Sequence, residues 1–235
     1  GRFTAEDYCY SPIVVVGANT AYIGCRETLR VIDVSAPDTP REVAPPVTLG
    51  ANIADLFAAP PYLYVATSEY YPASDADGLH VLDVSTPAVP LPVGHLPLAD
   101  ARRIVVDGTI ALVASDSYAS SGLRIVDVSN VAAPHELGAF WSPDGVASVF
   151  VAGGYAYVAG RSAVSETRSV SGLWVIDVRT PTAPRAAGFA QTPGTSEGVD
   201  VAGNYAYLAA GAAGLRVIDV STPGAPREVG FVDTP

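Results

Sequence analysis

The stretch Gly214–Gly230, GLRVIDVSTPGAPREVG, decides the fold, because four similar stretches precede it in the chain. Each copy has an apolar run that ends in an aspartate, then a turn rich in small residues and Pro, and then a shorter run. Self-similarity at a period of about 40 to 50 residues is the sequence signature of a repeat architecture. The aspartates that mark the five copies are Asp33, Asp83, Asp127, Asp177 and Asp219.

One repeat unit contains four strand signals, which are clearest in the last copy. Residues 198–202 (GVDVA) and 205–209 (YAYLA) are apolar runs separated by Gly203-Asn204, and such a dipeptide between two runs is a strong hairpin signal. Residues 215–220 (LRVIDV) form a third predicted strand, and residues 227–233 (REVGFVD) form a fourth, more polar one. We expect the other hairpin turns at Ala18-Asn19, Pro60-Pro61, Asp107-Gly108 and Gly153-Gly154.

Four antiparallel strands repeated five times predict an all-β fold, a five-bladed β-propeller with four strands in each blade. The third strand of each unit is almost continuously apolar, as expected of a strand that neighbouring blades cover on both faces. The chain begins on a first strand and ends on a fourth, so ring closure would need side-chain packing alone or a segment of another molecule. We expect a single domain over residues 1–235, with blades at about 8–50, 51–98, 99–144, 145–194 and 195–235.

The composition limits the classes of partner. The formal net charge is −11, and all 13 basic residues are Arg, so the surface repels phosphate and we expect neither nucleic acid nor anionic membrane as a partner. No apolar run reaches the length of a transmembrane helix, and we expect no membrane insertion. The expected partners are therefore proteins, including copies of this chain.

Cys9 and Cys25 are the only cysteines, and such a pair in a processed chain is more often a disulfide than a metal site. The predicted hairpin register places Cys25 opposite about Pro12, so a bridge to Cys9 requires an irregular start of the first strand. The chain contains no Met, from which we expect that it begins after a processing site or is a fragment.

The repeated LRVIDVS core, its P-x-x-P spacing and hairpins such as GNYAYLA (203–209) resemble the LVIVD-repeat family. The resemblance extends over essentially the whole chain, in five copies. It implies a β-propeller of the kind generally found in bacterial or archaeal surface or secreted proteins, and it implies no defined reaction and no catalytic residues. The second copy departs from the pattern at Pro60-Pro61 and Leu91-Pro92, and the third at Asn130-Val131, which lie in turns and an outer strand.

The repeated aspartates invite a metal-binding interpretation, but a residue present in every unit performs a task that every unit needs. Each ends an apolar strand before a turn, where a carboxylate can accept backbone N–H bonds, so we interpret all five as structural turn caps. Asp75 and Asp77, with Glu69, form an oxygen-rich loop that could hold Ca²⁺, although the spacing matches no complete calcium-loop signature. We therefore expect a solvated loop there, and no cofactor.

Charged residues at the predicted channel mouth are the best candidates for binding a small molecule. Arg103 and Glu197 lie next to an aligned column of first-strand residues that also carries charge. The column consists of Ile13, Asp55, Arg102, Ser148 and Gly198. The alternative, which we favour, is that salt bridges between Asp55 and Arg102, or between Glu197 and Arg103, plug the ring.

No catalytic signature is present. We expect His80, His95 and His135 in third or fourth strands of different blades, without metal-ligand spacing, and we find no nucleophile elbow, P-loop or zinc motif. The sequence thus predicts a non-enzymatic extracellular propeller for protein interaction or for self-assembly into a surface structure or fibre. One alternative is a ligand-binding or hydrolytic protein that acts at the channel mouth. Another is a glycan-binding adhesion module that uses aromatic residues on the loop-bearing face, namely Tyr70, Tyr71, Tyr118 and Trp141.

Overall fold

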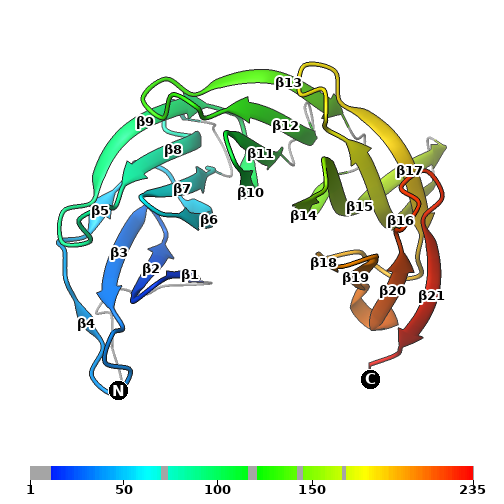
Figure 1. Ribbon diagram of the computed structural model, residues 1–235, viewed down its shortest axis with the longest axis horizontal. Helices are drawn as coiled ribbons and strands as arrows, with labels where there is room; N and C mark the ends of the chain where they lie inside the picture. Colours follow the sequence, from blue (N-terminus) through cyan, green and yellow to red (C-terminus); the bar gives the residue numbers. More distant parts are fainter. Residues whose placement is uncertain (1–11, 70–73, 116–120, 142–144, 166–167, 235) are drawn as a thin grey trace. The chain divides into compact units, whose positions relative to one another are not determined.

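The computed structural model describes residues 12–69, 74–115, 121–141, 145–165 and 168–234. In this part of the chain the regular structure is β-strand apart from one 3-10 turn, η1 (Gly211–Ala213), and no helix has the length and apolarity needed to cross a membrane. The strands form five sheets, in each of which consecutive strands of the chain lie side by side (Figure 1). Four sheets have four antiparallel strands, and the first has a fourth strand split into two pieces, which confirms the predicted all-β propeller class.

The sheets follow one another along the chain without exchanging strands. The first contains β1 (Ile13–Gly17), β2 (Thr20–Cys25), β3 (Thr28–Asp33), β4 (Arg41–Glu42) and β5 (Val47–Thr48). The second contains β6 (Ile53–Ala59), β7 (Tyr62–Thr67), β8 (Gly78–Asp83) and β9 (Leu91–Pro97). The third contains β10 (Ala101–Asp107), β11 (Ile110–Ser115), β12 (Gly122–Asp127) and β13 (His135–Trp141). The fourth contains β14 (Val146–Ala152), β15 (Tyr155–Ser165), β16 (Arg168–Asp177) and β17 (Arg185–Gln191). The fifth contains β18 (Gly198–Ala202), β19 (Tyr205–Ala209), β20 (Leu215–Asp219) and β21 (Arg227–Val232).

The chain divides into two compact units, one of residues 1–106 with 128–135 and one of residues 107–127 with 136–235. In each unit, a core lies between consecutive sheets. The first unit packs the β2–β3 side chains Tyr22, Leu29 and Val31 against the second-sheet side chains Leu56, Leu63, Val65 and Leu82. The second unit packs the β15–β16 side chains Tyr157, Leu173 and Val175 against the fifth-sheet side chains Ala206, Leu208 and Ile218.

The outer strand of the first sheet is split into β4 and β5. Pro45 and Pro46 lie between the two pieces, and proline has no backbone N–H to donate to a neighbouring strand. Pairing with β3 still continues on both sides of the interruption, with Val47 opposite Leu29 and Glu42 opposite Ile32.

The hairpin turn of the third sheet is Gly108-Thr109, not Asp107-Gly108 as predicted. Outside the Pro60-Pro61 turn, the first turn residue has a positive φ, and Gly108 (φ 60°) matches Gly153 (60°), Gly203 (59°) and Ala18 (53°) at this position. Moving the turn by one residue moves β10 by one residue, which exchanges the faces of its side chains. Arg103, not Arg102, therefore occupies the first-strand column of Asp55.

A glycine in the outer strand lets the turn of the next sheet approach closely. A Cβ placed on Gly188 would lie 2.5 Å from Pro223 O, and a Cβ on Gly138 would lie 2.6 Å from Pro181 O. Gly94 is likewise in contact with Val131 O. The glycine of the repeat is thus required by sheet-to-sheet packing, since a side chain would collide with backbone that cannot move away.

Candidate functional site

The repeated aspartates cap the turns that follow the third strands. In four of them, Oδ1 accepts a hydrogen bond from the backbone N–H two residues further on. The bonds are Ser35 N to Asp33 (2.9 Å), Ser85 N to Asp83 (2.9 Å), Arg179 N to Asp177 (3.1 Å) and Ser221 N to Asp219 (3.0 Å). Hydrogen bonds from Ser35 and from the Arg41 guanidinium lower the pKa of Asp33 to about 2.

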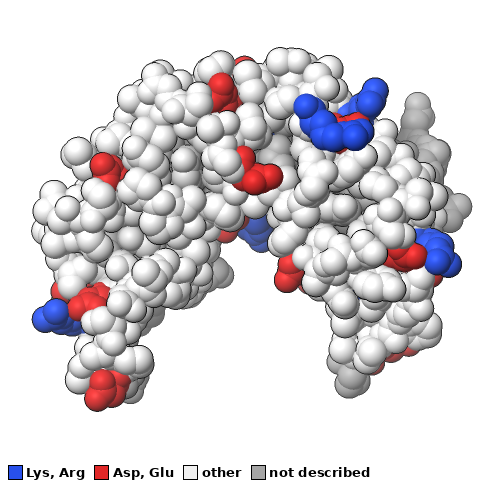
Figure 2. Space-filling model, in the orientation of Figure 1, with Lys and Arg blue, Asp and Glu red and all other residues white. Residues whose placement is uncertain are grey.

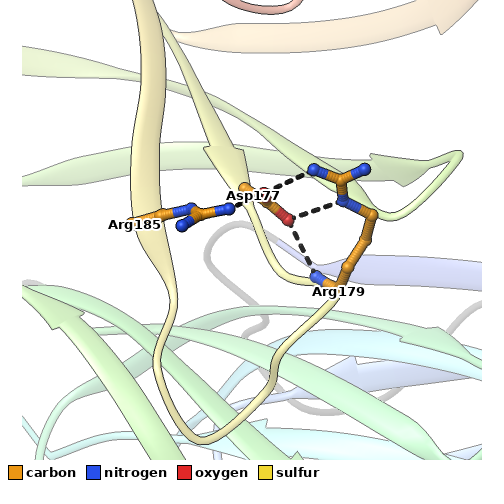
Figure 3. Close-up of polar contacts among 3 residues, drawn as sticks. All are labelled: Asp177, Arg179 and Arg185. Carbon is orange, nitrogen blue, oxygen red and sulfur yellow. Dashed lines mark hydrogen bonds and ion pairs between the residues drawn. The ribbon is translucent and has the colours of Figure 1, made fainter.

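Asp177 has the largest number of donors among these aspartates (Figure 3). Arg179 donates from Nε (2.9 Å) and from its terminal guanidinium nitrogen (2.7 Å), and Arg185 donates at 3.2 Å. The side-chain hydrogen bonds of Arg179 are the main cause of the strongly lowered pKa of Asp177. A carboxylate held ionised by two guanidinium groups serves to fix the turn and is unsuited to proton transfer.

Asp55 is bound by backbone rather than by an arginine. Its Oδ2 accepts the Ile104 N–H at 2.9 Å and its Oδ1 accepts the Leu56 N–H at 3.0 Å. Burial raises the pKa of Asp55, and these two hydrogen bonds act against the rise. Arg102 forms its ion pair with Asp100, with Nε and Oδ1 2.8 Å apart, so the favoured Asp55–Arg102 salt bridge is replaced by a different pairing.

The other two channel-mouth candidates also contact backbone. Arg103 donates from a terminal guanidinium nitrogen to its neighbour Arg102 O at 2.9 Å and to Ala54 O at 3.5 Å. Glu197 belongs to the second compact unit, where its N–H bonds Ala209 O at 2.9 Å. In the first unit, Asp55 and Arg103 thus link β6 to β10 through backbone groups, which is a structural task.

The acidic loop after β7 is organised by a buried carboxylate. Asp77 is 1% exposed and accepts N–H bonds from Glu69 (2.8 Å) and Ser74 (3.0 Å), whereas Asp75 is exposed. Glu69 accepts from the backbone and the side chain of Asn52 at 3.1 and 3.2 Å. The oxygens of Asp77 and Glu69 thus serve as acceptors for backbone and amide N–H groups of the loop and its neighbour. Within the described residues, no three His, Cys, Asp or Glu side chains gather as a metal site would require.

Two histidines that were predicted in different blades are neighbours in the second sheet. His80 in β8 pairs with His95 in β9, and their rings stack with centroids 4.2 Å apart. His80 Nε2 lies 2.8 Å from Ala76 O and 3.1 Å from the Thr67 hydroxyl. Burial lowers the pKa of His80, so a neutral ring at the base of the loop is favoured. The two histidines could have been recognised as neighbours from the pairing register of β8 and β9, which places His80 opposite His95.

Among the aromatic glycan-binding candidates, Trp141 is 53% exposed and lies under the Arg124 guanidinium, 4.9 Å from the ring centroid. Arg124 is itself paired with Glu136 at 2.7 Å. Tyr70, Tyr71 and Tyr118 lie outside the described residues. Cys25 is buried and disulfide-bonded, and Cys9 also lies outside the described residues.

On the face that Figure 2 shows, the charges are dispersed over the described residues. Figure 2 shows one side of the molecule, on which uncharged atoms dominate and the blue arginine groups lie against red acidic groups. The ion pairs Arg41–Asp33 and Arg227–Asp219, each 3.0 Å long, repeat this arrangement in the first and fifth sheets.

Several large apolar side chains are exposed on one face of the fifth sheet. Ala206, Leu208 and Ile218 of this sheet pack on the fourth sheet, so the alternate residues point to the opposite side. We call this opposite side the open face; it consists of Tyr205, Tyr207, Leu215, Val217 and Val232. Leu215 and Tyr207 are each 38% exposed and Val232 is 61% exposed.

The register positions of Leu215 and Tyr207 are buried in the other four sheets. The leucines equivalent to Leu215 are 0% exposed, and they are Leu29, Leu79, Leu123 and Leu173. The residues equivalent to Tyr207 are also buried, and they are Tyr22, Tyr64, Leu112 and Tyr157. Among the described residues, the open face therefore has the composition of a buried sheet surface, while Leu215 and Tyr207 are more exposed than their equivalents.

The repeat pattern defines the family. The LVIVD repeat pattern matches residues 11–45, 99–141, 145–192 and 193–234, which is more than half of the chain. The chain belongs to the LVIVD repeat family. The predicted resemblance is thereby confirmed, and the unmatched segment between residues 45 and 99 contains the Pro60-Pro61 turn that departs from the repeat. No curated protein matches the sequence of this LVIVD-repeat chain.

Several solved structures share the propeller fold of this LVIVD-repeat chain. Hydrazine synthase from Kuenenia stuttgartiensis matches with a TM-score of 0.67 and 15% identity over 88% of this chain and 63% of its own. BamB from Moraxella catarrhalis matches with a TM-score of 0.65 and 15% identity over 98% of this chain and 63% of its own. The computationally designed Ika8 protein matches with a TM-score of 0.68 and 10% identity over 94% and 62%. The LVIVD-repeat chain thus spans less than two thirds of each of these chains, and identities this low show the fold alone.

Proposed function

We propose that this LVIVD-repeat chain is a non-enzymatic, extracellular protein-interaction propeller, and that the open face of its fifth sheet is the surface through which it binds. One observation carries the proposal. Leu215 is 38% exposed at a register position where four equivalent leucines are 0% exposed. Contiguous exposed apolar surface on a folded protein marks sites of association with other proteins.

The charged groups support a role without catalysis. Four of the turn-cap aspartates accept backbone N–H bonds, and Asp55 accepts the N–H bonds of Leu56 and Ile104. A general base or nucleophile needs a side chain within reach of a substrate and a partner that orients it. The acidic, lysine-free composition and the disulfide of Cys25 support an oxidising, extracellular setting.

Thiol labelling of a cysteine at position 215 tests whether the open face is available. In Leu215→Cys, we expect rapid reaction with a thiol reagent in dilute solution, close to the rate of the exposed control Val89→Cys (Val89 is 65% exposed). The matched control Leu173→Cys, at the equivalent buried position, should react only on unfolding. Protection of position 215 at every dilution, to the degree seen at 173, would show that the face is covered and would defeat the proposal.

A further inference from the structure

We infer that the stacked pair of His80 and His95 is an acid-sensitive lock on the second sheet, which holds the segment before β8 in place while His80 is neutral and releases it when His80 gains a proton. The lock consists of residues of the first compact unit, so it is independent of the open face of the fifth sheet. Its features are the contacts of one ring nitrogen, the surroundings of the ring, and the residues found at the same positions of the other sheets.

His80 lies where three segments of the second sheet meet. Its Nε2 is 2.8 Å from Ala76 O and 3.1 Å from the Thr67 hydroxyl, which itself donates to Ala76 O at 2.7 Å. The peptide after Ala76 reaches the third segment, because Leu98 N donates to Asp77 O at 3.1 Å. His80 therefore ties the segment before β8 to the end of β7 and, through Asp77, to the residue that follows β9.

These contacts decide where a second proton would be added. A carbonyl oxygen can only accept, so His80 Nε2 donates to Ala76 O and the second proton must be taken up by Nδ1. The described residues supply no hydrogen-bond acceptor for Nδ1, and the residue is 9% exposed. A positive charge on this ring would therefore depend on the little solvent that reaches it.

The neighbouring titratable groups supply no countercharge. His95 lies opposite His80 in β9 (Figure 1), and the rings stack with centroids 4.2 Å apart, so protonation of both places two like charges together. Within the described part of the chain, neither ring forms an ion pair with a carboxylate. The adjoining first-sheet segment 47–50 has no titratable side chain. The acids of the neighbouring loop are either exposed or bound to N–H groups of other residues, and they are Asp75, Asp77 and Glu69.

The same positions of the other sheets do not change charge in mild acid. In the first, third and fifth sheets an arginine replaces His80 and pairs with an outer-strand glutamate. The pairs are Arg30–Glu42 (3.2 Å), Arg124–Glu136 (2.7 Å) and Arg216–Glu228 (3.4 Å). The fourth sheet has Trp174 packed on Phe189, which does not titrate. The second sheet has Pro92 at the glutamate position, so it combines two titratable rings with no acid of its own strand pair.

The direction of the pH response follows from the burial of His80. Burial lowers the pKa of His80, and the hydrogen bond to Ala76 O acts against this shift. The opened segment, in which the histidine has its ordinary pKa of about 6.5, therefore binds the proton more tightly than the closed one. The lock contributes fully above about pH 6.5 and weakens as the pH falls toward the lowered pKa of the closed state. Between about pH 7.5 and about pH 5, the opening equilibrium can rise by no more than about 30-fold, the value reached if the closed ring takes up no proton.

Amide hydrogen exchange of the whole chain between about pH 7.5 and about pH 5 tests the lock. The reporters are the amide of Gly78, which donates to the Thr67 hydroxyl oxygen at 3.1 Å, and the amide of Leu98. After correction for intrinsic exchange rates, we expect the protection of both amides to fall in wild type, with about 30-fold as the limit. In His80→Gln the protection should stay constant, because the glutamine amide can donate to Ala76 O but takes up no proton. His135→Gln, which changes an exposed histidine of β13, should behave as wild type.

Two results would overturn the inference. Protection in wild type that changes by less than about twofold would show that no lock opens, and an equal fall in His80→Gln would show that another group opens it. His95→Gln keeps the test decisive if His80→Gln is already unprotected at neutral pH, since it removes one of the two charges and leaves the contacts of His80 in place. The fall in protection should then be smaller than in wild type, and a fall of the same size would exclude the stacked pair as its cause. Labelling at position 215 does not depend on any of these results, so the proposed function is tested separately.

Discussion

Truncation of one leucine in each of two consecutive sheets would measure how much less Leu215 contributes to the free energy of unfolding than the fully buried Leu173. Leu173 and Leu215 occupy the same register position, opposite Ala159 and Ala209. Leu173 is 0% exposed and Leu215 is 38% exposed. A Leu→Ala change at a fully buried site loses the transfer free energy of the removed atoms and leaves a cavity, and we expect about 3 kcal/mol at position 173. At position 215 the side chain is already partly hydrated and no closed cavity forms, so we expect about 1 kcal/mol.

The assay is urea and thermal unfolding of wild type, Leu173→Ala and Leu215→Ala in dilute solution, where association does not contribute. The expected difference of about 2 kcal/mol between the variants corresponds to about 4–8 °C in Tm for a chain of this size. The slopes of the urea transitions should agree among the three proteins, which would show that the free energy of unfolding has changed and not the denatured state. Equal losses of stability at the two positions would refute the reasoning, because Leu215 would then be as well covered as Leu173.

Four further substitutions test the packing between sheets, the backbone contacts of Asp55 and the turn cap Asp177. Gly188→Ala should lower the free energy of unfolding by about 2 kcal/mol, because the added methyl group collides with the turn of the next sheet. Gly230→Ala should change the free energy of unfolding by less than about 0.5 kcal/mol in monomeric protein, because the added methyl group meets no atom within 4 Å. Urea unfolding checks both variants. Asp55→Ala should cost about 2 kcal/mol in the same assay, because two backbone N–H groups lose their acceptor. The lowered pKa of Asp177, due chiefly to Arg179, means that this carboxylate stabilises the fold above the unfolded pKa of about 4, and that the contribution is lost as the pH falls through the lower folded pKa. The Tm gap between wild type and Asp177→Asn should therefore narrow between about pH 7 and about pH 2, and a gap that widens on acidification would contradict the assignment.

The repeat pattern predicts the sheets because strand order and strand length both follow from the sequence period. The hydrophobic alternation of YAYLA and the apolar run of LRVIDV each appear where a strand is found, β19 and β20 among them. The turn-capping interpretation of the aspartates needs only local geometry, since the acceptor and the N–H donor are two residues apart. Predictions of this local kind depend on neighbouring residues in the chain and on nothing more distant.

Predictions that depend on register are less secure. Asp107-Gly108 and Gly108-Thr109 are adjacent dipeptides with the same glycine, and only the positive φ of Gly108 at the first turn position decides between them. That difference of one residue exchanges the positions of Arg102 and Arg103, and Arg102 pairs with Asp100 instead of Asp55. The stacking of His80 on His95 likewise requires the register between β8 and β9, which the separate strand patterns do not contain.

The open face could not be predicted from residue types at all. Leu173 and Leu215 are the same residue type at the same position of the repeat, so the residue type does not distinguish the buried position from the exposed one. The distinction lies in the exposed fraction of the side chain, which depends on what packs above it. The same reasoning applies to Gly188 and Gly230, which differ only in the backbone found beside them.

The outer-strand glycines give successive sheets the same kind of contact. Because each contact consists of a glycine on one sheet and a short proline-bounded turn on the next, it is independent of the number of repeats. Duplication or deletion of a whole repeat would leave the remaining contacts intact, as in repeat proteins whose stability sums over nearest neighbours. Change in the number of modules is therefore a conservative step in the evolution of this chain, whereas a methyl group on one of these glycines is not.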